Sequence, residues 1–364
     1  MMEIAVFVLA SLSVSWSLTK LLSSPRAAFR IVDTPNQRSL HARATPRTGG
    51  VAIMAAMLFA TASLVMLGRA VVLAGAARAA ALDVMNPDLL TTLVAATFLA
   101  GVSLWDDRHE LSPALRLLTH SAAAAAVMWG GNLTITGFSV PFFGVVTLGW
   151  TSYAFTFLFI VWMTNLYNFM DGMDGFAGGM TLVGFGFLGA LGLAGGAAGL
   201  GVLALIVAAA AAGFLTFNYP PARIFMGDVG AVPLGFLAAA LAVKGNRDNV
   251  IGLWVPAIIF SPFIVDATVV LVKRMLAGKR VWEAHREHYY QRLVLAGWSH
   301  RRTVWMEYLL MVAWGLVAVI YKWLGETGHV AVLALGVMVY AAFAIGVGVV
   351  ERRNRGPHRL RNAG

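Results

Sequence analysis

The chain has 364 residues, of which 59% are hydrophobic and only 12% are charged, and its mean hydropathy is +0.76. Soluble domains carry about 25% charged residues, and a single aqueous core stops growing near ~250–300 residues, so the composition excludes a soluble globular protein. The 27 Lys and Arg outnumber the 17 Asp and Glu, and the absence of cysteine excludes disulfides, thiolate nucleophiles and cysteine-bound metals.

Eleven stretches are long and apolar enough to cross a bilayer, for which about 20 residues are needed. They lie near residues 4–22, 49–68, 89–105, 114–131, 145–164, 176–196, 199–217, 230–243, 250–272, 304–323 and 329–350. Glu3 stands where a cleaved signal would carry basic residues, so the first stretch is expected to remain as a span. The pattern predicts an all-α polytopic membrane protein with one transmembrane domain (1–350) and a basic tail (351–364).

Basic residues predict the orientation, because Lys and Arg accumulate in cytoplasmic loops. With eleven spans, 22 of the 27 Lys and Arg fall on one side of the membrane. The other side keeps five, which are Arg69, Arg78, Lys244, Arg247 and Lys322. This asymmetry places the N-terminus in the periplasm and the C-terminus in the cytoplasm, and it explains most of the basic excess without nucleic acid.

Five polar segments lie at the predicted cytoplasmic ends of spans, at about 23–50, 106–113, 165–175, 217–230 and 273–303. The first contains Arg43 and Arg47 and leads to a Gly-Gly pair; by itself it is equally an ordinary basic loop. The second contains Asp106 and Asp107. Adjacent carboxylates repel each other unless a cation lies between them or a base is needed, and a solvated loop is the alternative.

The third segment places Asn165, Asn168, Asp171 and Asp174 three residues apart. Residues at this spacing share one face of a helix, so the segment predicts a stripe of amides and carboxylates. Hard oxygen ligands at this density suit Mg²⁺ or phosphate chemistry. A polar seam between helices is the alternative.

The fourth segment contains Asn218, Phe225 and Asp228, with Asp228 between glycines at the start of a span. Its carboxylate is placed either to interact with the positive end of that helix or to bind a metal. Asp266 lies near the cytoplasmic end of the ninth span and either reaches the site or pairs with a basic neighbour.

The fifth segment is basic, and His285, His288 and Arg292 share one face if it is helical. Two histidines without further ligands disfavour zinc, which usually takes three or four protein ligands. Histidine and arginine donors suit a diphosphate, and a plain interfacial helix is the alternative.

In their order and position, the five segments resemble the polyprenyl-phosphate N-acetylhexosamine-1-phosphate transferase family (glycosyltransferase family 4). The resemblance covers residues 32 to 300 approximately. It rests on four motifs: Asp106-Asp107, Asn168-Phe-Met-Asp171-Gly-Met-Asp174-Gly175, Phe225-Met-Gly-Asp228-Val-Gly230 and His285-x-x-His288. Two departures stand out: Glu110 replaces the last Asp of the family's Asp-Asp-x-x-Asp pattern, and some relatives have a third histidine in the last motif.

The resemblance implies ten or eleven helices around a cytoplasm-facing cleft in the bacterial inner membrane, and eleven is similar to the WecA branch of the family. It implies transfer of a sugar-1-phosphate from a UDP-N-acetylhexosamine to undecaprenyl phosphate, with release of UMP, at the first membrane step of O-antigen or similar cell-envelope glycan synthesis. UDP-GlcNAc is the default donor, and UDP-GalNAc, UDP-FucNAc and UDP-QuiNAc stay open, as does a homodimer. The alternatives are a muramyl-pentapeptide donor or a transporter, although transporters carry their charges at mid-membrane in repeated halves.

The resemblance also implies a site. Mg²⁺, or Mn²⁺, is the expected cofactor, with Asp228, Asp107 and Asp171 as its ligands. The implied catalytic residues are Asp106, Asp107, Asp171, His285 and His288. The implied substrate-binding residues are Arg43, Arg47, Asn168, Asp174, Asn218, Phe225 and Arg292, and the resemblance places Asn168, Asp174, Asn218 and Phe225 in the nucleotide pocket. A phosphate acceptor is largely dianionic at pH 7, so the expected task is charge neutralisation, and one-step and covalent routes both stay open.

Overall fold

Apolar helices form nearly all of the structure, a computed structural model that describes residues 2–27, 29, 31–35, 40, 43–70, 72–280 and 285–359, with side chains up to residue 353. The helices are α1 (Met2–Leu22), α2 (Gly49–Arg69), α3 (Gly75–Val84), α4 (Pro87–His109), α5 (Pro113–Trp129), α6 (Thr151–Met170), α7 (Phe176–Ala194), α8 (Ala198–Asn218), α9 (Asp228–Arg247), α10 (Trp254–Ile259), α11 (Ser261–Leu276), α12 (Tyr289–Leu295), α13 (His300–Tyr321) and α14 (Glu326–Arg359). Strand β1 (Val32–Asp33) pairs with β2 (Thr45–Pro46), and β3 (Gly137–Val140) pairs with β4 (Gly144–Thr147), both antiparallel.

Eight of the described helices are long and apolar enough to span a membrane: α1, α2, α4, α7, α8, α9, α13 and α14. The other predicted spans also coincide with helices, namely α5, α6 and the pair α10 and α11, which fall short of these limits in length or hydropathy. The prediction of an all-α, multi-pass membrane protein is therefore confirmed.

Two of the predicted spans have wrong boundaries. The stretch 145–164 begins in strand β4, and its helix, α6, starts only at Thr151. The stretch 250–272 is two helices, α10 and α11, which meet at Phe260. Pro262 stands in the first turn of α11, and proline lacks the backbone N–H that an uninterrupted helix would need there. The chain therefore breaks the helix just before this residue.

Helix α9 lies at the centre of the bundle, and 94% of its apolar stretch of 18 residues is buried inside the protein. It packs against α2, α4, α6, α7 and α8. Its middle contains Ala238, Ala239 and Ala240, all fully buried, and such small side chains let neighbouring backbones approach closely in a membrane. This packing holds the first residue of α9, Asp228, beside the ends of α4 and α6.

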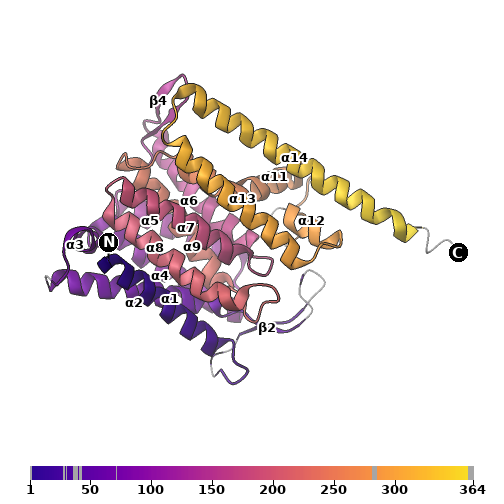
Figure 1. Cartoon of the computed structure of the whole chain (residues 1–364), viewed down its shortest axis with the longest axis horizontal. Coiled ribbons are helices and arrows are strands. Elements are labelled where there is room, and N and C mark those ends of the chain that lie inside the picture. The colour runs from indigo at the N-terminus through magenta and orange to yellow at the C-terminus, as the bar shows by residue number, and fades with distance from the viewer. Residues whose placement is uncertain are drawn as a thin grey trace.

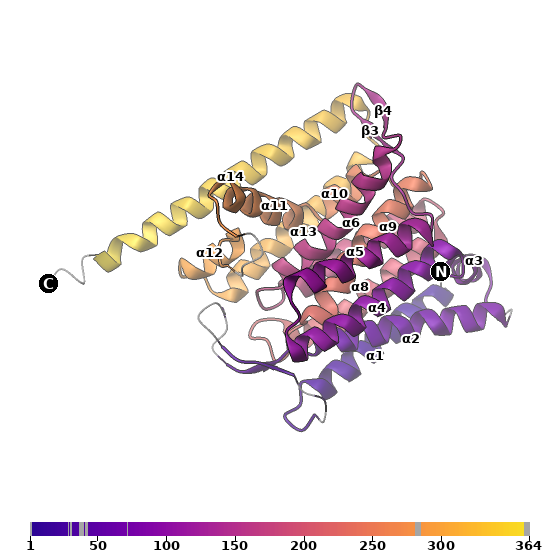
Figure 2. The same cartoon turned by 180° about the vertical axis from the view of Figure 1, so that it is seen from behind.

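The ends of the bundle differ in character (Figures 1 and 2). Helix α1 begins at the end that carries α3 and the β3–β4 pair, whereas α14 ends at the opposite end, near α12 and the β1–β2 pair. Helix α14 lies on the outside of the bundle, contacts α12 and α13, and extends past the other helices. The described residues of all five polar segments adjoin the end that carries α12.

A buried ion network closes the opposite end. Lys244, only 4% exposed, lies 2.8 Å from Asp88, 3.0 Å from Asp248 and 3.7 Å from Asp83. Arg247 binds the same Asp88 carboxylate. Two of the five basic residues predicted on this side are therefore neutralised within the protein, where they join α3 and α4 to α9.

Candidate functional site

The polar residues of segment 165–175 form a ladder with segment 218–228. Asn168 donates a side-chain hydrogen bond to Asp228, and the backbone N–H of Gly227 donates to Asp171. Farther along, Asp174 Oδ2 accepts from the N–H of Ala222 at 3.0 Å. The two segments therefore run antiparallel, and the three-residue spacing seen in the sequence matches successive contacts along the opposite segment.

The ladder corrects the expectation of one helical stripe. Helix α6 ends at Met170, so Asp171 and Asp174 lie in the turn before α7. Asn165 is still on α6, where its side chain faces His120 of α5 at 3.2 Å. Asn165 therefore belongs to a polar contact between two helices, which was the alternative interpretation of this segment. Asp171 and Asp174 instead face the loop that precedes α9.

Three aspartates from two helices meet at the end of α4. Asp106 and Asp107 are both buried in its last turn, and Asp228 begins α9. Arg116 joins them, because its Nε lies 2.7 Å from Asp106 Oδ2 and its Nη1 lies 3.8 Å from Asp228 Oδ2. Arg47 lies 3.4 Å from Asp107 Oδ1. The arrangement is a carboxylate cluster interleaved with two guanidinium groups.

Asp171 belongs to the same cluster through its charge. Burial, together with the negative charges of Asp228, Asp107 and Asp174, raises the pKa of Asp171 to about 7. A carboxyl group with this pKa is half protonated near neutrality, and a cation placed beside it would favour the charged form.

Close backbone contacts hold these loops in place. The N–H groups of Gly49 and Gly50 donate to the carbonyl oxygens of Phe225 and Met226, at 2.9 and 2.8 Å. A Cβ at Gly50 would come within 2.2 Å of the backbone nitrogen of Gly230. The Gly-Gly pair singled out in the sequence is therefore required for packing, because only glycine lets the start of α2 approach the start of α9 so closely.

A second compartment adjoins the carboxylate cluster. It is a cavity of about 570 Å³ whose walls include Arg43, Asp174, Phe225, His300 and Arg301. The predicted nucleotide-binding residues Asp174 and Phe225 thus share one cavity with the basic residue Arg43. Asp174 lies three residues after Asp171 in the sequence, and Phe225 lies three residues before Asp228. Both Asp171 and Asp228 belong to the carboxylate cluster.

Asn218 does not line this cavity. Its Oδ1 accepts from the N–H of Gly175 and its Nδ2 donates to the carbonyl of Ile224, both at 2.9 Å. Both ends of the buried side-chain amide are therefore hydrogen-bonded within the protein. In this structure Asn218 joins the turn before α7 to the loop before α9.

The histidine segment forms a third group. His288 is buried and its Nδ1 lies 3.1 Å from Asp266 Oδ1, which also accepts from the N–H of Tyr289. Asp266 therefore pairs with this segment. The segment is not one continuous helix: α12 starts at Tyr289, and His288, with extended backbone, is its N-cap. His285 precedes the helix.

One histidine of this group is neutral, and its arginine is paired within the protein. Burial, helped by His288 and Arg274, lowers the pKa of His285 to about 4, so its imidazole is neutral at pH 7. Arg292 makes two hydrogen bonds, of 2.8 and 2.7 Å, to Glu351 of α14. The group touches segment 165–175 through Tyr290, whose buried hydroxyl lies against Gly172.

Two basic residues of the site were missed by the sequence analysis. Arg116 carries no motif, but it is a charged residue inside a predicted span, and such residues are usually functional. That signal was available. His300 stands within segment 273–303 without any pattern around it, and only the folded chain brings it to Asp174, at 3.5 Å.

The carboxylate cluster offers oxygen donors of the kind that bind a divalent cation. No three His, Asp or Glu side chains of the described residues lie close enough together to hold a metal as they stand. However, Asp107 Oδ2 is buried without a hydrogen-bond partner among these residues. The carboxylate of Asp171 is repelled by the negative charges of neighbouring aspartates, which raise its pKa. Carboxylate oxygens are the donors that Mg²⁺ prefers. The residues therefore fit a hard divalent cation that would compensate this charge.

The chain is similar to several known proteins. The model of glycosyl transferase family 4 matches residues 89–246. The chain is 30% identical to the "Probable undecaprenyl-phosphate N-acetylglucosaminyl 1-phosphate transferase" of Bacillus subtilis, over 84% of this chain and 82% of that protein. It is 28% identical to the decaprenyl-phosphate N-acetylglucosaminephosphotransferase of Mycobacterium leprae, over 97% and 92%.

A more distant relative matches only part of the chain. The phospho-N-acetylmuramoyl-pentapeptide-transferase of Listeria monocytogenes is 27% identical over 49% of this chain and 52% of that protein. The resemblance inferred from the sequence motifs is confirmed. The chain belongs to glycosyl transferase family 4, the polyprenyl-phosphate N-acetylhexosamine-1-phosphate transferases.

Proposed function

We propose that the protein transfers N-acetylhexosamine-1-phosphate from a UDP-sugar to undecaprenyl phosphate and releases UMP. The observation that carries this proposal is the meeting of Asp106, Asp107, Asp171 and Asp228 with two arginines at one end of a membrane-embedded bundle. Acidic groups of this density suit chemistry between phosphates. A transporter is less well supported, because these charges lie at helix ends rather than at mid-membrane.

The reaction joins two anions. An oxygen of the acceptor phosphate attacks the β-phosphorus of the donor, and the bond between that phosphorus and the bridging oxygen breaks as UMP leaves. The acceptor is largely dianionic at pH 7, so it needs little help from a base. The main barrier is repulsion between the phosphates, and positioning and positive charge lower it.

Arg47 and Arg116 supply positive charge from the protein, because both already pair with the carboxylates of the cluster. Asp228, Asp107 and Asp171 would hold Mg²⁺ or Mn²⁺, with Asp106 beside them. When bound, the ion supplies neutralisation of the diphosphate and of the leaving UMP. Asp106 and Asp107, at the end of α4, are placed to orient the acceptor phosphate.

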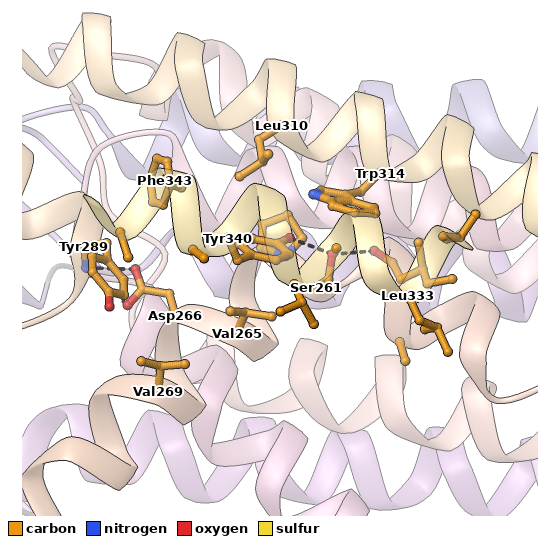
Figure 3. Close-up of a pocket in the computed structure, with 18 of the residues that line it drawn as sticks. Ser261, Val265, Asp266, Val269, Tyr289, Leu310, Trp314, Leu333, Tyr340 and Phe343 are labelled. Carbon is orange, nitrogen blue, oxygen red and sulfur yellow. Dashed lines mark hydrogen bonds between the residues drawn. The ribbon is translucent and has the colours of Figure 1, made fainter. Parts of the chain in front are cut away.

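The acceptor also needs a place for its apolar chain. A cavity of about 470 Å³ lies between α10, α11, α13 and α14, and nearly all of its lining is apolar. Trp314 and Tyr340 stack across it, with ring centroids 5.5 Å apart, and Tyr340 bonds to Ser261 (Figure 3). Asp266 and Tyr289, next to the histidine segment, lie at one end. We propose that the polyprenyl chain follows this cavity.

UDP-GlcNAc is the donor that we propose, since relatives that match over most of their length are named for N-acetylglucosamine. The muramyl-pentapeptide transferase shares only half of the chain. The product would start O-antigen or a similar envelope glycan. Eleven crossings, with the N-terminus in the periplasm and the C-terminus and active site in the cytoplasm, complete the proposal.

The test uses purified enzyme in nanodiscs with undecaprenyl phosphate, Mg²⁺ and a panel of UDP-sugars. We expect acceptor-dependent UMP release and a labelled lipid product, greatest with UDP-GlcNAc. Asp228→Asn should lower the rate at least ~100-fold, the loss typical when a principal charge stabiliser is removed. Glu326→Gln, at the opposite end of the bundle, is the control and should leave the rate unchanged. Donor uptake into proteoliposomes without acceptor would instead support a transporter.

A further inference from the structure

The apolar cavity of about 470 Å³ between α10, α11, α13 and α14 is lined by two carboxylates, Asp266 and Glu307. Asp266 is held by the protein, because it accepts from the N–H of Tyr289 and lies 3.1 Å from His288 Nδ1. Glu307 is only 3% exposed, and it has no hydrogen bond or ion pair with any other described residue. The charge that acts on it most strongly is that of Asp266, which is also negative. The described part of the chain therefore leaves one buried acidic group of this cavity unpaired.

Helix α13 presents this group on the face that lines the cavity. Glu307, Leu310 and Trp314 are all lining residues, and spacings of three and seven residues place them on one side of a helix. Figure 3 shows Leu310 and Trp314 of this face above Tyr340, on which Trp314 stacks. Glu307 lies seven residues after His300, the first residue of α13, which is about 10 Å along the helix axis. The carboxyl group is thus inside the bundle, well below its α12 end.

The surroundings of Glu307 suit a positive charge. Burying a carboxylate away from water is costly unless it is paired, and no Lys or Arg is among the described residues that line the cavity. A polyprenyl chain carries no cation, so it would leave Glu307 unpaired. A ligand with an ammonium group would pair with it. The rings of Tyr289, Trp314 and Tyr340 also line the cavity, and the faces of such rings attract cations.

The remainder of the cavity suits the apolar body of such a ligand. Its volume of about 470 Å³ lies within the range of roughly 300–1,000 Å³ found for pockets that hold small molecules. We propose that the cavity binds an apolar amine, with the ammonium group beside Glu307 and the apolar body between α11, α13 and α14. The amine and the polyprenyl chain would contact the same walls, so the amine should inhibit transfer. That consequence alone rests on the proposed function.

The test compares octylamine with octan-1-ol, which differ in charge but hardly in length, since an alkyl amine is protonated at pH 7 as lysine is. Each radiolabelled ligand is titrated onto the protein in nanodiscs of zwitterionic lipid, and binding to empty nanodiscs is subtracted. The wild type should prefer octylamine. Glu307→Gln should weaken octylamine binding about 10- to 100-fold, the range for a hydrogen bond to a charged group, and leave octanol unchanged. Glu326→Gln, at the opposite end of the bundle, is the matched control and should change neither.

A second variant tests the position of the ligand. Gly336 of α14 lines the cavity, and a Cβ there would meet only Trp314, at 3.4 Å. Gly336→Leu should therefore fold, extend its side chain into the cavity and abolish saturable binding of both ligands. Thermal unfolding of both variants checks the fold.

Two outcomes would overturn the proposal. Equal octylamine affinity in the wild type and in Glu307→Gln would mean that the carboxyl group does not contact the amine. Saturable octylamine binding that survives Gly336→Leu would place the amine outside the cavity. Inhibition of transfer is measured separately, with undecaprenyl phosphate as the competitor. If octylamine binding depends on Glu307 but leaves transfer unchanged, the amine site stands and the acceptor chain follows another path.

Discussion

At the scale of single residues, aspartates that look alike in the sequence have different surroundings. Asp171 and Asp174 belong to one motif, yet the first lies in the carboxylate cluster and the second faces His300 in the adjoining cavity. Asn218, which the resemblance places in the nucleotide pocket, hydrogen-bonds through both ends of its side-chain amide to backbone groups of the protein. Motif spacing identified which residues matter, but the role of each follows from which atoms the fold leaves free.

Gly227 gives the sharpest prediction at this scale. Its φ is +72°, and a Cβ there would lie 2.4 Å from the carbonyl oxygen of Arg47 and 3.1 Å from Asp107 Oδ2. Gly227→Ala should therefore strain the backbone by about 1–2 kcal/mol, displace the Asp107 carboxylate and reduce transfer at least ~10-fold. Steady-state UMP release and thermal unfolding measure the two effects.

Gly186→Ala is the control for this substitution, since Gly186 lies in α7 and a Cβ there meets nothing within 4 Å. It should retain full activity. Wild-type transfer by Gly227→Ala would contradict the close approach of these two loops.

At the scale of elements, an ion pair joins α12 to α14. The guanidinium of Arg292 lies over the ring of Tyr289 and makes a bidentate contact with Glu351, a strong geometry for a charged pair. Glu351 holds the pKa of Arg292 above its usual range. Beside this pair, Val347 of α14 packs against Val270 and Tyr289, so an ionic contact and an apolar contact together hold the C-terminal half of the helix.

A charge exchange tests this role. Arg292→Glu should destabilise the protein by about 1–2 kcal/mol, because it leaves two carboxylates facing each other. The double variant Arg292→Glu with Glu351→Arg should restore the unfolding temperature. If stability returns but transfer does not, Arg292 also contacts the diphosphate, as the motif resemblance implies. Failure to restore stability would mean that the pair does not anchor α14.

At the scale of the whole molecule, the two ends of the bundle carry opposite chemistry. The end near α12 gathers the acidic cluster, the cavity and most of the basic loops, whereas the other end is closed by the Lys244 network and the β3–β4 pair. Two of the few basic residues on that side are internal ion-pair partners. This sharpens the charge asymmetry on which the proposed orientation rests.

The absence of cysteine allows a direct test of orientation, because each introduced cysteine is the only one. Ser139 in β3 and Ala277 after α11 are both exposed and lie at opposite ends. In intact cells, a membrane-impermeant maleimide should label Ser139→Cys and spare Ala277→Cys, and permeabilised cells should label both. Labelling of Ala277→Cys alone in intact cells would reverse the proposed topology.

The membrane class and nearly all of the helices can be read from the sequence alone, because the apolar length of a span is a local property. It also pointed to the carboxylates, since acidic residues are rare and costly in such a chain. The local sequence pattern did not show the break between α10 and α11 at Phe260. A proline such as Pro262 occurs both in a kinked continuous helix and at the start of a new one, and the packing of the neighbouring helices selects between the two. The boundaries of α6 and α12 were missed for a related reason, as strand β4 and the His288–Asp266 contact lie outside any helical period.

Only the tertiary structure decided which polar groups meet. Arg116 reaches Asp106 and Asp228 from a third helix, and His300 reaches Asp174 from more than a hundred residues away. Such contacts depend on how α9 is buried among its neighbours, and no spacing along the chain encodes them. Composition and motifs fix the chemistry that is available, whereas packing fixes the distances, and electrostatic interactions depend on distance.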